Sequence, residues 1–314
     1  MRLSELGEFG LLAELERRGL AHGLDAEGAV LGGDLVVTQD SLVEGAHFRL
    51  AWTSWRDLGY KAAAVNLSDL AALGAEPEAL VLGLAVPDDT EADDVLELYE
   101  GIAETGVPVL GGDTAAAPQI VLSVTAVGHS ERVPGRGRAR PGDALVLTGP
   151  LGGAAAGLEV LRRDLEGFEE LVRMHRRPPI RLEEGRRLAR VAHALVDLSD
   201  GIAGDAARIA ERSRCLLVVE VERLPLVPRI EEVGEAPFWT LGEDYELLAA
   251  VAADDVEALG FPLVGWCEEG SGVEIRLSGT PIDVAAWDSF RAWSRQGSRE
   301  ASSPFDLTPG SCSP

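Results

Sequence analysis

Five aspartates of the chain share one local setting that suits metal and phosphate chemistry. Each follows an apolar run and has Gly, Ser or Thr beside it: Asp40 in TQDS, Asp69 in VNLSDL, Asp113 in VLGGDT, and Asp197 and Asp200 in VDLSDG. A carboxylate at the end of a buried strand needs a partner, either turn amides or a metal ion. Small neighbours let a phosphate approach the backbone. One such aspartate is typical of a helix N-cap, but five together indicate a phosphate site with several metal ions.

Two segments of the chain carry the same Leu-Ser-Asp core. VNLSDLAALGA covers residues 65–75, and VDLSDGIAGDA covers residues 196–206. A distant duplication would explain the likeness, and so would coincidence in a chain rich in these residues. The two explanations stay open. Either way, each half of the chain carries a carboxylate at the end of an apolar run.

The basic residues of the chain are almost all arginine: it has 27 Arg and a single Lys, Lys61. An ammonium is a compact point charge, whereas a guanidinium is a broad planar fork. Lys61 therefore either fills a site that needs the smaller cation or is a chance exception on a helix surface. The residues around it do not decide between the two.

The charge and hydropathy patterns exclude several classes of partner. A net charge of −25 opposes non-specific binding to nucleic acid and to anionic lipid. The acidity serves solubility, or it holds divalent metal that neutralises an anionic substrate. No apolar run approaches the roughly 18 residues of a membrane span, and the N-terminus lacks the apolar core of a signal peptide. We therefore expect a cytoplasmic protein without nucleic-acid or membrane partners.

Several common catalytic and metal motifs are absent from the sequence. It has no P-loop, protein-kinase, GxSxG or HExxH motif, and its three cysteines form no CxxC pair. Of the five histidines, only His47 lies in a suggestive cluster, LVEGAHF, with a structural role as the alternative. By themselves, the residues favour a Mg²⁺-dependent enzyme that acts on phosphate compounds.

The hydrophobic pattern predicts an α/β fold with mixed sheets in two lobes. Helices are expected over residues 3–19, 54–74, 90–106, 150–163, 181–194 and 202–213. Strands are expected as a pair around the Gly-Gly-Asp turn of 28–48, and over 79–87, 107–114, 119–130, 144–149, 195–201, 216–222, 237–251 (after a loop) and 261–267. The turn-rich basic stretch 129–143 is the expected lobe boundary, which gives an N-terminal lobe of 1–137, a C-terminal lobe of 138–297 and a disordered tail of 298–314.

Several blocks of the chain together resemble a known family. They are the stretch from Thr38 to Pro77, then VLGGDT, ARPGDALVLTG with LGGAAAGL, VDLSDG and GEDYELL. In this order they are similar to the thiamine-monophosphate kinases, relatives of aminoimidazole ribonucleotide synthetase and selenophosphate synthetase. The resemblance runs from about Leu6 to Trp293. It implies transfer of the γ-phosphoryl group of ATP to thiamine monophosphate, with several Mg²⁺ ions, in a homodimer whose N-terminal lobes pair their sheets into a barrel.

The resemblance also implies roles for individual residues. Metal ions would lie on Asp40, Asp69, Asp113, Asp197 and Asp200, with Thr38 nearby. ATP would contact Tyr99, Gly112, Asp113, Ser199 and Arg136, with Arg138 close behind Arg136. The thiamine compound would lie near His47, Glu243 and Trp287. No general base is expected, because the accepting phosphate oxygen is already anionic and positioning supplies the rest.

One departure from the family pattern concerns the segment before the first strand. The family has Gly-Asp-Asp-Ala-Ala there, whereas this chain has Asp25, Ala26 and Glu27 followed by Gly and Ala. Glu27 is then a longer substitute for the aspartate pair, and one metal is bound differently or more weakly. The alternatives are an ATP-using relative with another acceptor, or a degenerate protein that binds nucleotide or thiamine phosphate without turnover.

Overall fold

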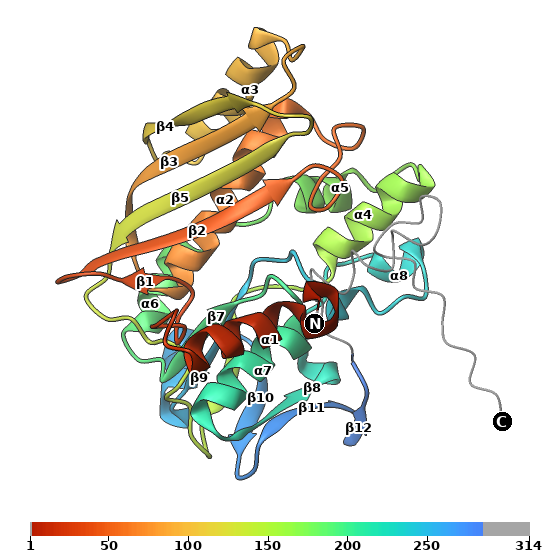
Figure 1. Cartoon of the computed structure of the whole chain (residues 1–314). Coiled ribbons are helices and arrows are strands. Elements are labelled where there is room, and N and C mark those ends of the chain that lie inside the picture. Colours follow the sequence, from red (N-terminus) through yellow and green to blue (C-terminus); the bar gives the residue numbers. More distant parts are fainter. Residues whose placement is uncertain (1, 285–314) are drawn as a thin grey trace.

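The computed structural model describes residues 2–284, which build two mixed sheets with helices around them. The first sheet has the order β1-β2-β5-β3-β4 and is antiparallel except where β3 pairs with β4. Its strands are β1 (Ala29–Val30), β2 (Leu35–Val43), β3 (Glu76–Val86), β4 (Val109–Ala116) and β5 (Val121–His129). Helices α2 (Trp55–Ala72) and α3 (Ala92–Ala103) cover one face of this sheet (Figure 1).

The second sheet has the order β12-β11-β8-β10-β6-β9-β7, and only β8 and β11 run parallel. Its strands are β6 (Ala144–Leu147), β7 (Ala194–Asp197), β8 (Leu216–Glu220), β9 (Leu247–Val251), β10 (Leu263–Glu268), β11 (Gly272–Leu277) and β12 (Thr280–Ile282). The helices are α1 (Leu3–Arg17), α4 (Gly153–Arg163), α5 (Glu169–Arg176), α6 (Leu182–Ala189), α7 (Ile202–Ser213), α8 (Ile230–Val233) and α9 (Val256–Leu259), with short 3₁₀ turns η1 (Val221–Arg223), η2 (Phe238–Thr240) and η3 (Ala253–Asp255). The predicted α/β class with two mixed sheets is confirmed.

Helix α2 connects the two halves of the molecule. It packs against β2 and β5 of the first sheet and against α6 and β7 of the second half. Such close contacts need small residues. A Cβ on Gly59 would lie 1.9 Å from the carbonyl oxygen of Leu98 on α3, and a Cβ on Gly185 of α6 would lie 2.2 Å from that of Ala71. Only glycine lets these backbones approach so closely.

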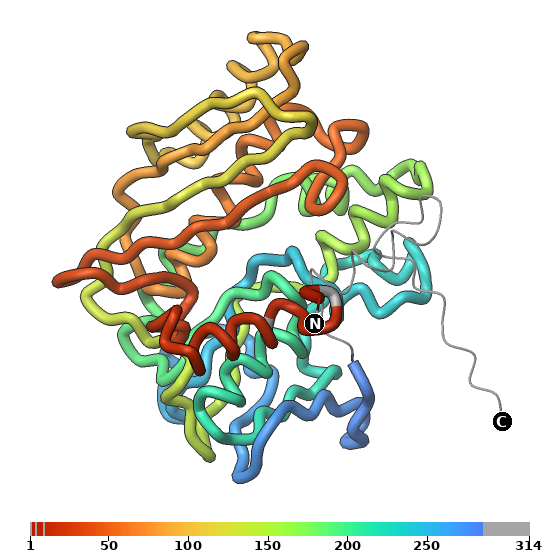
Figure 2. Tube along the Cα trace, in the orientation of Figure 1, coloured from red at the N-terminus to blue at the C-terminus, as the bar shows by residue number. Residues whose placement is uncertain are grey.

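The chain passes from the first sheet to the second between His129 and Ala144, within the predicted basic stretch. Helix α1 does not stay with the first sheet but lies alongside α7, as the tube in Figure 2 shows. Arg212 of α7 fastens this segment, with Nη2 2.9 Å from Glu16 and Nη1 3.2 Å from Asp25. In the described chain, no helix is both long and apolar enough to cross a membrane.

The far face of the first sheet is polar and carries no helix of the described chain (Figure 1). Hydroxyl and amide side chains on β2 and β5 bond to one another there. Ser41 lies 3.0 Å from Ser123, and Thr125 donates to Gln39 at 3.0 Å. Beside them, β4 is an edge strand with almost every residue exposed. The prediction of a buried strand over 107–114 is therefore wrong for the chain by itself.

The strand-end setting expected for five aspartates holds for Asp197, the last residue of β7. It is wrong for three others. Asp40 lies inside β2, and β4 continues past Asp113 instead of turning at Gly-Gly-Asp. Asp69 lies on α2, within the helix predicted over residues 54–74, because Ala-rich sequence on both sides favours a helix over a strand. Asp200 lies in the connection between β7 and α7.

Candidate active site

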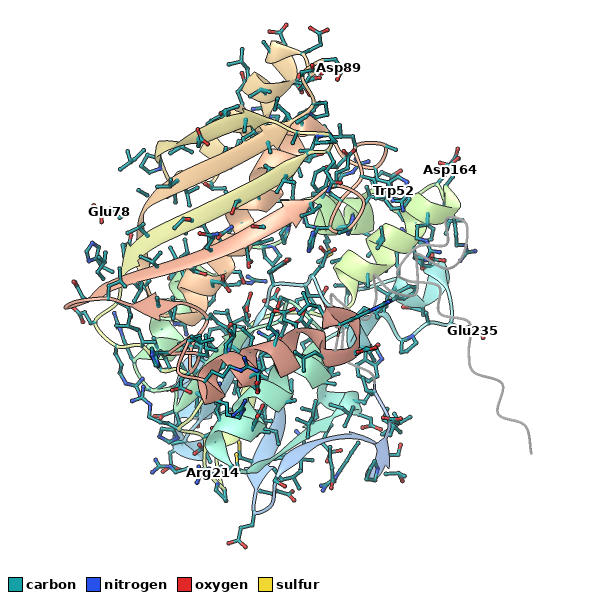
Figure 3. The ribbon with its side chains drawn as sticks, in the orientation of Figure 1. Trp52, Glu78, Asp89, Asp164, Arg214 and Glu235 are labelled. Carbon is teal, nitrogen blue, oxygen red and sulfur yellow. The ribbon has the colours of Figure 1, made fainter. Side chains whose placement is uncertain are left out.

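Three carboxylates from distant parts of the chain meet where α2 faces the second sheet. Glu27 precedes β1, Asp69 comes from α2 and Asp197 ends β7, and each places an oxygen within 4.8 Å of the other two. Two hydroxyls hold the cluster: Thr38 of β2 donates to Asp69, and Ser68 donates to Asp197 at 2.7 Å. By contrast, Figure 3 shows the labelled carboxylates Glu78, Asp89 and Asp164 projecting from the periphery.

Burial and mutual repulsion raise the pKa values of Asp69 and Asp197, and that of the neighbouring Asp40. Burial and the negative charge of Glu27 raise the pKa of Asp197 to about 8. Burial, followed by the charges of Asp40 and Asp197, holds the pKa of Asp69 well above its ordinary value. Asp40 opens to solvent, yet the dense surroundings and the charge of Glu27 raise its pKa to about 6. Carboxylates crowded in this way favour protonation or a bound cation.

The donor set therefore fits a hard divalent cation. Carboxylate and hydroxyl oxygens are the ligands that Mg²⁺ prefers, and no soft sulfur or imidazole belongs to the cluster of Glu27, Asp69 and Asp197. Asp40, whose raised pKa arises partly from Glu27 and Asp200, adds a solvent-facing carboxylate. The group can thus hold metal on its buried side and leave the open side to a ligand.

Asp200 lies at the edge of this cluster and is paired with an arginine side chain. Arg208 of α7 donates to its carboxylate, and the backbone N–H of Asp200 donates to Asp205 at 3.0 Å. Burial raises the pKa of Asp205 well above its ordinary value, with the charge of Asp200 adding to the effect. Arg208 also lies 3.6 Å from Asp205, so it counters the repulsion between the two carboxylates. Sequence reasoning missed both Arg208 and Asp205.

Glu27 is fixed by Arg136 of the basic stretch. The guanidinium donates from Nε to Oε1 at 3.0 Å and from Nη2 to Oε2, which is the two-pronged geometry of an Arg–carboxylate pair. The backbone N–H of Arg136 also donates to the carbonyl oxygen of Asp25 at 2.7 Å. The longer side chain predicted to replace an aspartate pair thus reaches Asp69 and Asp197 while Arg136 holds it.

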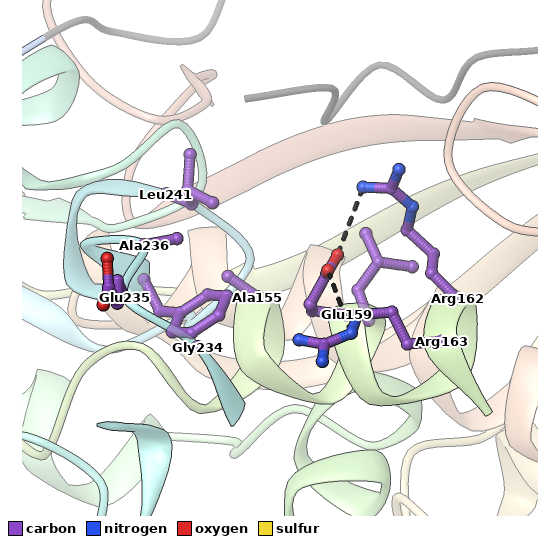
Figure 4. Close-up of a pocket in the computed structure, with 10 residues that line it drawn as sticks. Ala155, Glu159, Arg162, Arg163, Gly234, Glu235, Ala236 and Leu241 are labelled. Carbon is purple, nitrogen blue, oxygen red and sulfur yellow. Dashed lines mark hydrogen bonds and ion pairs between the residues drawn. The ribbon is translucent and has the colours of Figure 1, made fainter. Parts of the chain in front are cut away.

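Two cavities are lined by residues of the described chain, and the first of them adjoins the acidic cluster. One of about 560 Å³ is lined by residues between 22 and 30, by residues 133–138 and by Arg212. Arg136 reaches from its wall into the acidic cluster. The other, of about 220 Å³, lies between α4 and the segment 234–241 (Figure 4), where Glu159 is flanked by Arg162 and Arg163. Its lining includes Leu241, which precedes the GEDYELL loop by one residue.

A second polar cluster lies around Glu243 of that loop. Lys61 of α2 places Nζ 2.9 Å from Oε1 of Glu243, and His175 of α5 places Nδ1 3.5 Å from Oε2. The charge of Lys61 lowers the pKa of Glu243 against the opposing effect of burial. Burial lowers the pKa of His47, whose Nδ1 accepts the backbone N–H of Val43 at 3.1 Å. Lys61 thus has a partner that its own helix does not provide.

The GEDYELL loop holds its shape through contacts on both sides. Asp244 accepts the N–H groups of Gly152 and Ala154 at 2.8 and 3.3 Å at the start of α4, and burial raises its pKa to about 7. Glu246 accepts two bonds from Arg181, at 2.6 and 2.8 Å. The loop therefore ties α4 and the strand β9 to the position of Glu243.

The structure of a single chain does not bring the other predicted residues to the acidic cluster. Asp40 aligns across β5 and β3 with Gly112 on β4, three strands away, or about 14 Å at the usual strand spacing. Asp113 aligns with Gly83 and Ser123, so it shares the polar far face of the sheet, and Tyr99 lies on α3. Trp287 lies outside the described residues.

Ser199 lies next to the acidic cluster and is tied to the GEDYELL loop. Its carbonyl oxygen accepts the N–H of Glu243 at 2.9 Å. Sequence reasoning singled out Lys61 without giving it a role, and it missed Ser68 and His175. The sequence did contain signals for Lys61 and Ser68: Lys61 is the single lysine, and Ser68 belongs to a repeated Leu-Ser-Asp core. A histidine in an ordinary amphipathic helix gives no such signal.

Comparisons with known proteins match both halves of the chain. The family described as AIR synthase related protein matches with its N-terminal domain over residues 25–130 and with its C-terminal domain over residues 140–260. The chain is 34% identical to a thiamine-monophosphate kinase of Aquifex aeolicus, over 92% of this chain and 100% of that protein. It is 37% identical to the enzyme of that name from Salmonella typhimurium, over 78% and 82% of the two chains.

Solved structures of thiamine-monophosphate kinases superpose on this chain along most of its length. A structure described as AaThiL complexed with AMPPCP and TMP superposes with a TM-score of 0.85 and 32% identity. The match covers 92% of this chain and 98% of that one. The relatives therefore extend over both sheets and over the helix α2 that joins them.

Proposed function

This chain belongs to the thiamine-monophosphate kinase family, and from that premise we propose that it transfers the γ-phosphoryl group of ATP to thiamine monophosphate. The products are thiamine diphosphate and ADP. The observation that carries the proposal is the meeting of Glu27, Asp69 and Asp197 within 4.8 Å of one another. A kinase whose donor and acceptor are both phosphates needs such a carboxylate cluster, because two polyanions must be held together.

The proposed metal ligands are Glu27, Asp69 and Asp197 on the buried side, and Asp40, Asp200 and Thr38 toward the open side. Mg²⁺ bound there would supply the positive charge that offsets the repulsion between the phosphates of donor and acceptor. The chain supplies rigid supports for these ligands: Arg136 holds Glu27, Ser68 holds Asp197 and Arg208 holds Asp200. Because the supports come from both halves of the molecule, the packing of the two halves sets the geometry.

The remaining residues of the site bind and orient. The accepting phosphate oxygen is anionic at neutral pH, so no side chain has to remove a proton from it. We propose that Glu243 and His47 face the thiamine part of the acceptor, with Trp287 as the aromatic partner. Arg136 and Ser199 would lie on the nucleotide side. Positioning two bound phosphates in line accounts for most of the rate enhancement in such a transfer.

A homodimer would reconcile Tyr99, Gly112 and Asp113 with a role in this site. They lie on α3 and on the exposed edge strand β4, away from Asp40 of the same chain. A second copy that covers the polar face of the first sheet would also cover the unpaired edge of β4, which otherwise invites pairing. We therefore propose that two copies pair their first sheets and that each lends its β4 edge to the site of the other.

The proposal is tested with purified protein, ATP, Mg²⁺ and thiamine monophosphate, with thiamine diphosphate quantified by chromatography. Asp69→Asn keeps the shape of the side chain, removes a ligand and should lower kcat at least about a hundredfold. Asp254→Asn is the matched control, since Asp254 is exposed on the second half and belongs to no cluster described here. An inactive wild type that binds ATP would contradict the proposal and favour a binding protein.

A further inference from the structure

Lys61 makes a buried ion pair that joins the two halves of the molecule beside the proposed acceptor site. Its side chain is 5% exposed, and Nζ lies 2.9 Å from Oε1 of Glu243, 182 residues later in the chain. Moving an ammonium from water into the protein interior costs free energy. A buried pair of this kind therefore suggests that the position of its partner, here Glu243, matters to the protein. The chain uses Arg at 27 of its 28 cationic positions and has its single Lys here.

Glu243 is held on a backbone that leaves little freedom. Its φ is +68°, in the left-handed region that side chains other than glycine rarely adopt. The neighbouring Gly242 has no room for a side chain, because a Cβ there would lie 1.8 Å from the carbonyl oxygen of Ser199. With its N–H bonded to the same oxygen, Glu243 cannot shift without breaking contacts at the Leu-Ser-Asp segment.

The two oxygens of Glu243 have different surroundings. Oε1 accepts from Lys61, whereas Oε2 faces Nδ1 of His175 at 3.5 Å, beyond hydrogen-bond distance. Within the described residues, Nδ1 of His175 is buried and has no hydrogen-bond partner. Burial and the charge of Lys61 lower the pKa of His175 to about 3, so the ring is neutral at pH 7 and bonds to the backbone of Ala154.

Among the described residues, one acceptor oxygen of Glu243 therefore has no hydrogen-bond donor and is left for a ligand. The Glu243 side chain is 24% exposed, unlike Lys61 and His175 behind it. A carboxylate has only acceptor sites, so its open oxygen selects an N–H or O–H donor. The organic part of thiamine monophosphate offers such a donor in the amino group of its pyrimidine ring.

The same helix face relates this carboxylate to the metal cluster. Lys61 and Ser68 are seven residues apart on α2, which is two helical turns, so they leave the same face about 10 Å apart. Ser68 bonds to Asp197 of the cluster, and Lys61 bonds to Glu243. Helix α2 thus sets the separation between the proposed phosphate end and the proposed organic end of the acceptor.

We propose that Lys61 is a positioning residue that holds the Glu243 carboxylate so that its open oxygen accepts a hydrogen bond from an amino group on the organic part of the acceptor. The inference rests on the proposed function, in which Glu243 contacts thiamine monophosphate. In this proposal Glu243 determines acceptor specificity. Lys61 acts through Glu243 and itself contacts neither substrate.

Steady-state kinetics of Lys61→Met with both substrates test the proposal. Loss of the ammonium should raise the KM for thiamine monophosphate about tenfold or more, which is the change expected when one charge-assisted hydrogen bond is lost. The KM for ATP should stay within about twofold of the wild-type value. Glu243→Gln should give a similar effect. Because the two residues act as one unit, the double variant should be no worse than the poorer single variant.

Arg177→Met is the matched control. Arg177 also joins α2 to the region after α5, with Nε 2.5 Å from Asp57, but it lies outside the Glu243 cluster. Its loss should lower the melting temperature without changing the KM for the acceptor. The phosphate ester of a thiamine analogue with a ring carbonyl in place of the amino group gives a second readout. Wild type should discriminate against it, and Lys61→Met should discriminate less.

Several outcomes would overturn the inference. They are an unchanged acceptor KM in Lys61→Met, equal rises in both KM values, or additive effects in the double variant. If Lys61→Met does not fold, the double variant removes the unpaired charge of Glu243 and is compared with Glu243→Gln instead. An inactive wild type would overturn the proposed function itself. An active wild type whose variants show no rise in KM specific to the acceptor would overturn only the role of Lys61.

Discussion

Ser68 on α2 donates a hydrogen bond of 2.7 Å from Oγ to Oδ2 of Asp197 at the end of β7. The two residues belong to the two Leu-Ser-Asp segments, so the serine of the first holds the aspartate that comes just before the Leu-Ser-Asp core of the second. Asp69, next to Ser68, reaches the same cluster. The two segments thus meet in space, although their core aspartates differ in setting: Asp69 lies on α2, and Asp200 lies in the connection between β7 and α7.

Removal of this hydroxyl should destabilise the protein measurably. Ser68→Ala leaves a buried carboxyl without a donor, and we expect the free energy of unfolding to fall by about 1–3 kcal/mol in EDTA. Urea denaturation followed by circular dichroism measures it. Ser278→Ala is the control, because Ser278 donates to Glu222 at the exposed surface and its loss should cost within about 0.5 kcal/mol. Equal losses in the two variants would contradict the role given to Ser68.

The acidic cluster should make stability depend on pH in a direction set by its raised pKa values. The pKa values of Asp40 and Asp197 are about 6 and about 8 in the fold, against about 3.9 for a free side chain. The protonated carboxyls therefore favour the fold, and this contribution is complete below about pH 4 and lost as pH rises through both folded values. In EDTA, the melting temperature should fall between pH 5 and pH 8.

Mg²⁺ should reverse that trend, because it binds the ionised carboxylates. At pH 8, free Mg²⁺ at about fifty times its Kd should add roughly 2 kcal/mol to the free energy of unfolding, with a smaller gain at pH 5. Differential scanning calorimetry at both pH values, with EDTA or MgCl₂, gives the comparison. Asp197→Asn should flatten the pH dependence, whereas Asp254→Asn should not. A melting temperature in EDTA that rises with pH would be inconsistent with the cluster.

Glu27→Gln tests whether glutamate replaces the aspartate pair of the family. The variant keeps the shape but loses one of the charges that raise the pKa values of Asp69 and Asp197. We expect a higher melting temperature in EDTA at pH 8 and a Mg²⁺ requirement raised about tenfold in the kinase assay. Activity at saturating Mg²⁺ should largely return. An unchanged Mg²⁺ dependence would remove Glu27 from the ligand set.

Subunit complementation tests the proposed exchange of β4 edges. Asp69→Asn and Asp113→Asn should each abolish turnover without unfolding the protein. If the two residues of one site come from different copies, a mixed dimer of the variants keeps one intact site of two. After subunit exchange, an equal mixture should recover roughly a quarter of wild-type activity, since half of the dimers are mixed. No recovery in dimers shown to have exchanged would place both residues in the site of one chain.

The sequence alone determined the α/β class, most of the helices and strands, and the short list of carboxylates from which the cluster is drawn. Apolar periodicity and turn residues act locally, so the pair β1–β2, the amphipathic helix α3 and the strand end at Asp197 follow from neighbouring residues. The sequence also predicted Glu27 as a member of the acidic group, because Glu27 stands where the family has a pair of aspartates, and the structure places it there.

Only the tertiary structure decided which of these residues meet. The sequence predicts a helix at Asp69, but only the packing of α2 brings Asp69 to Glu27 and Asp197. Lys61 likewise meets Glu243 only across 182 residues of chain. Asp113 has the same local setting as Asp40, yet the strand order puts it at the opposite edge and on the opposite face. Proximity between distant segments arises from packing and strand order, which no local pattern encodes.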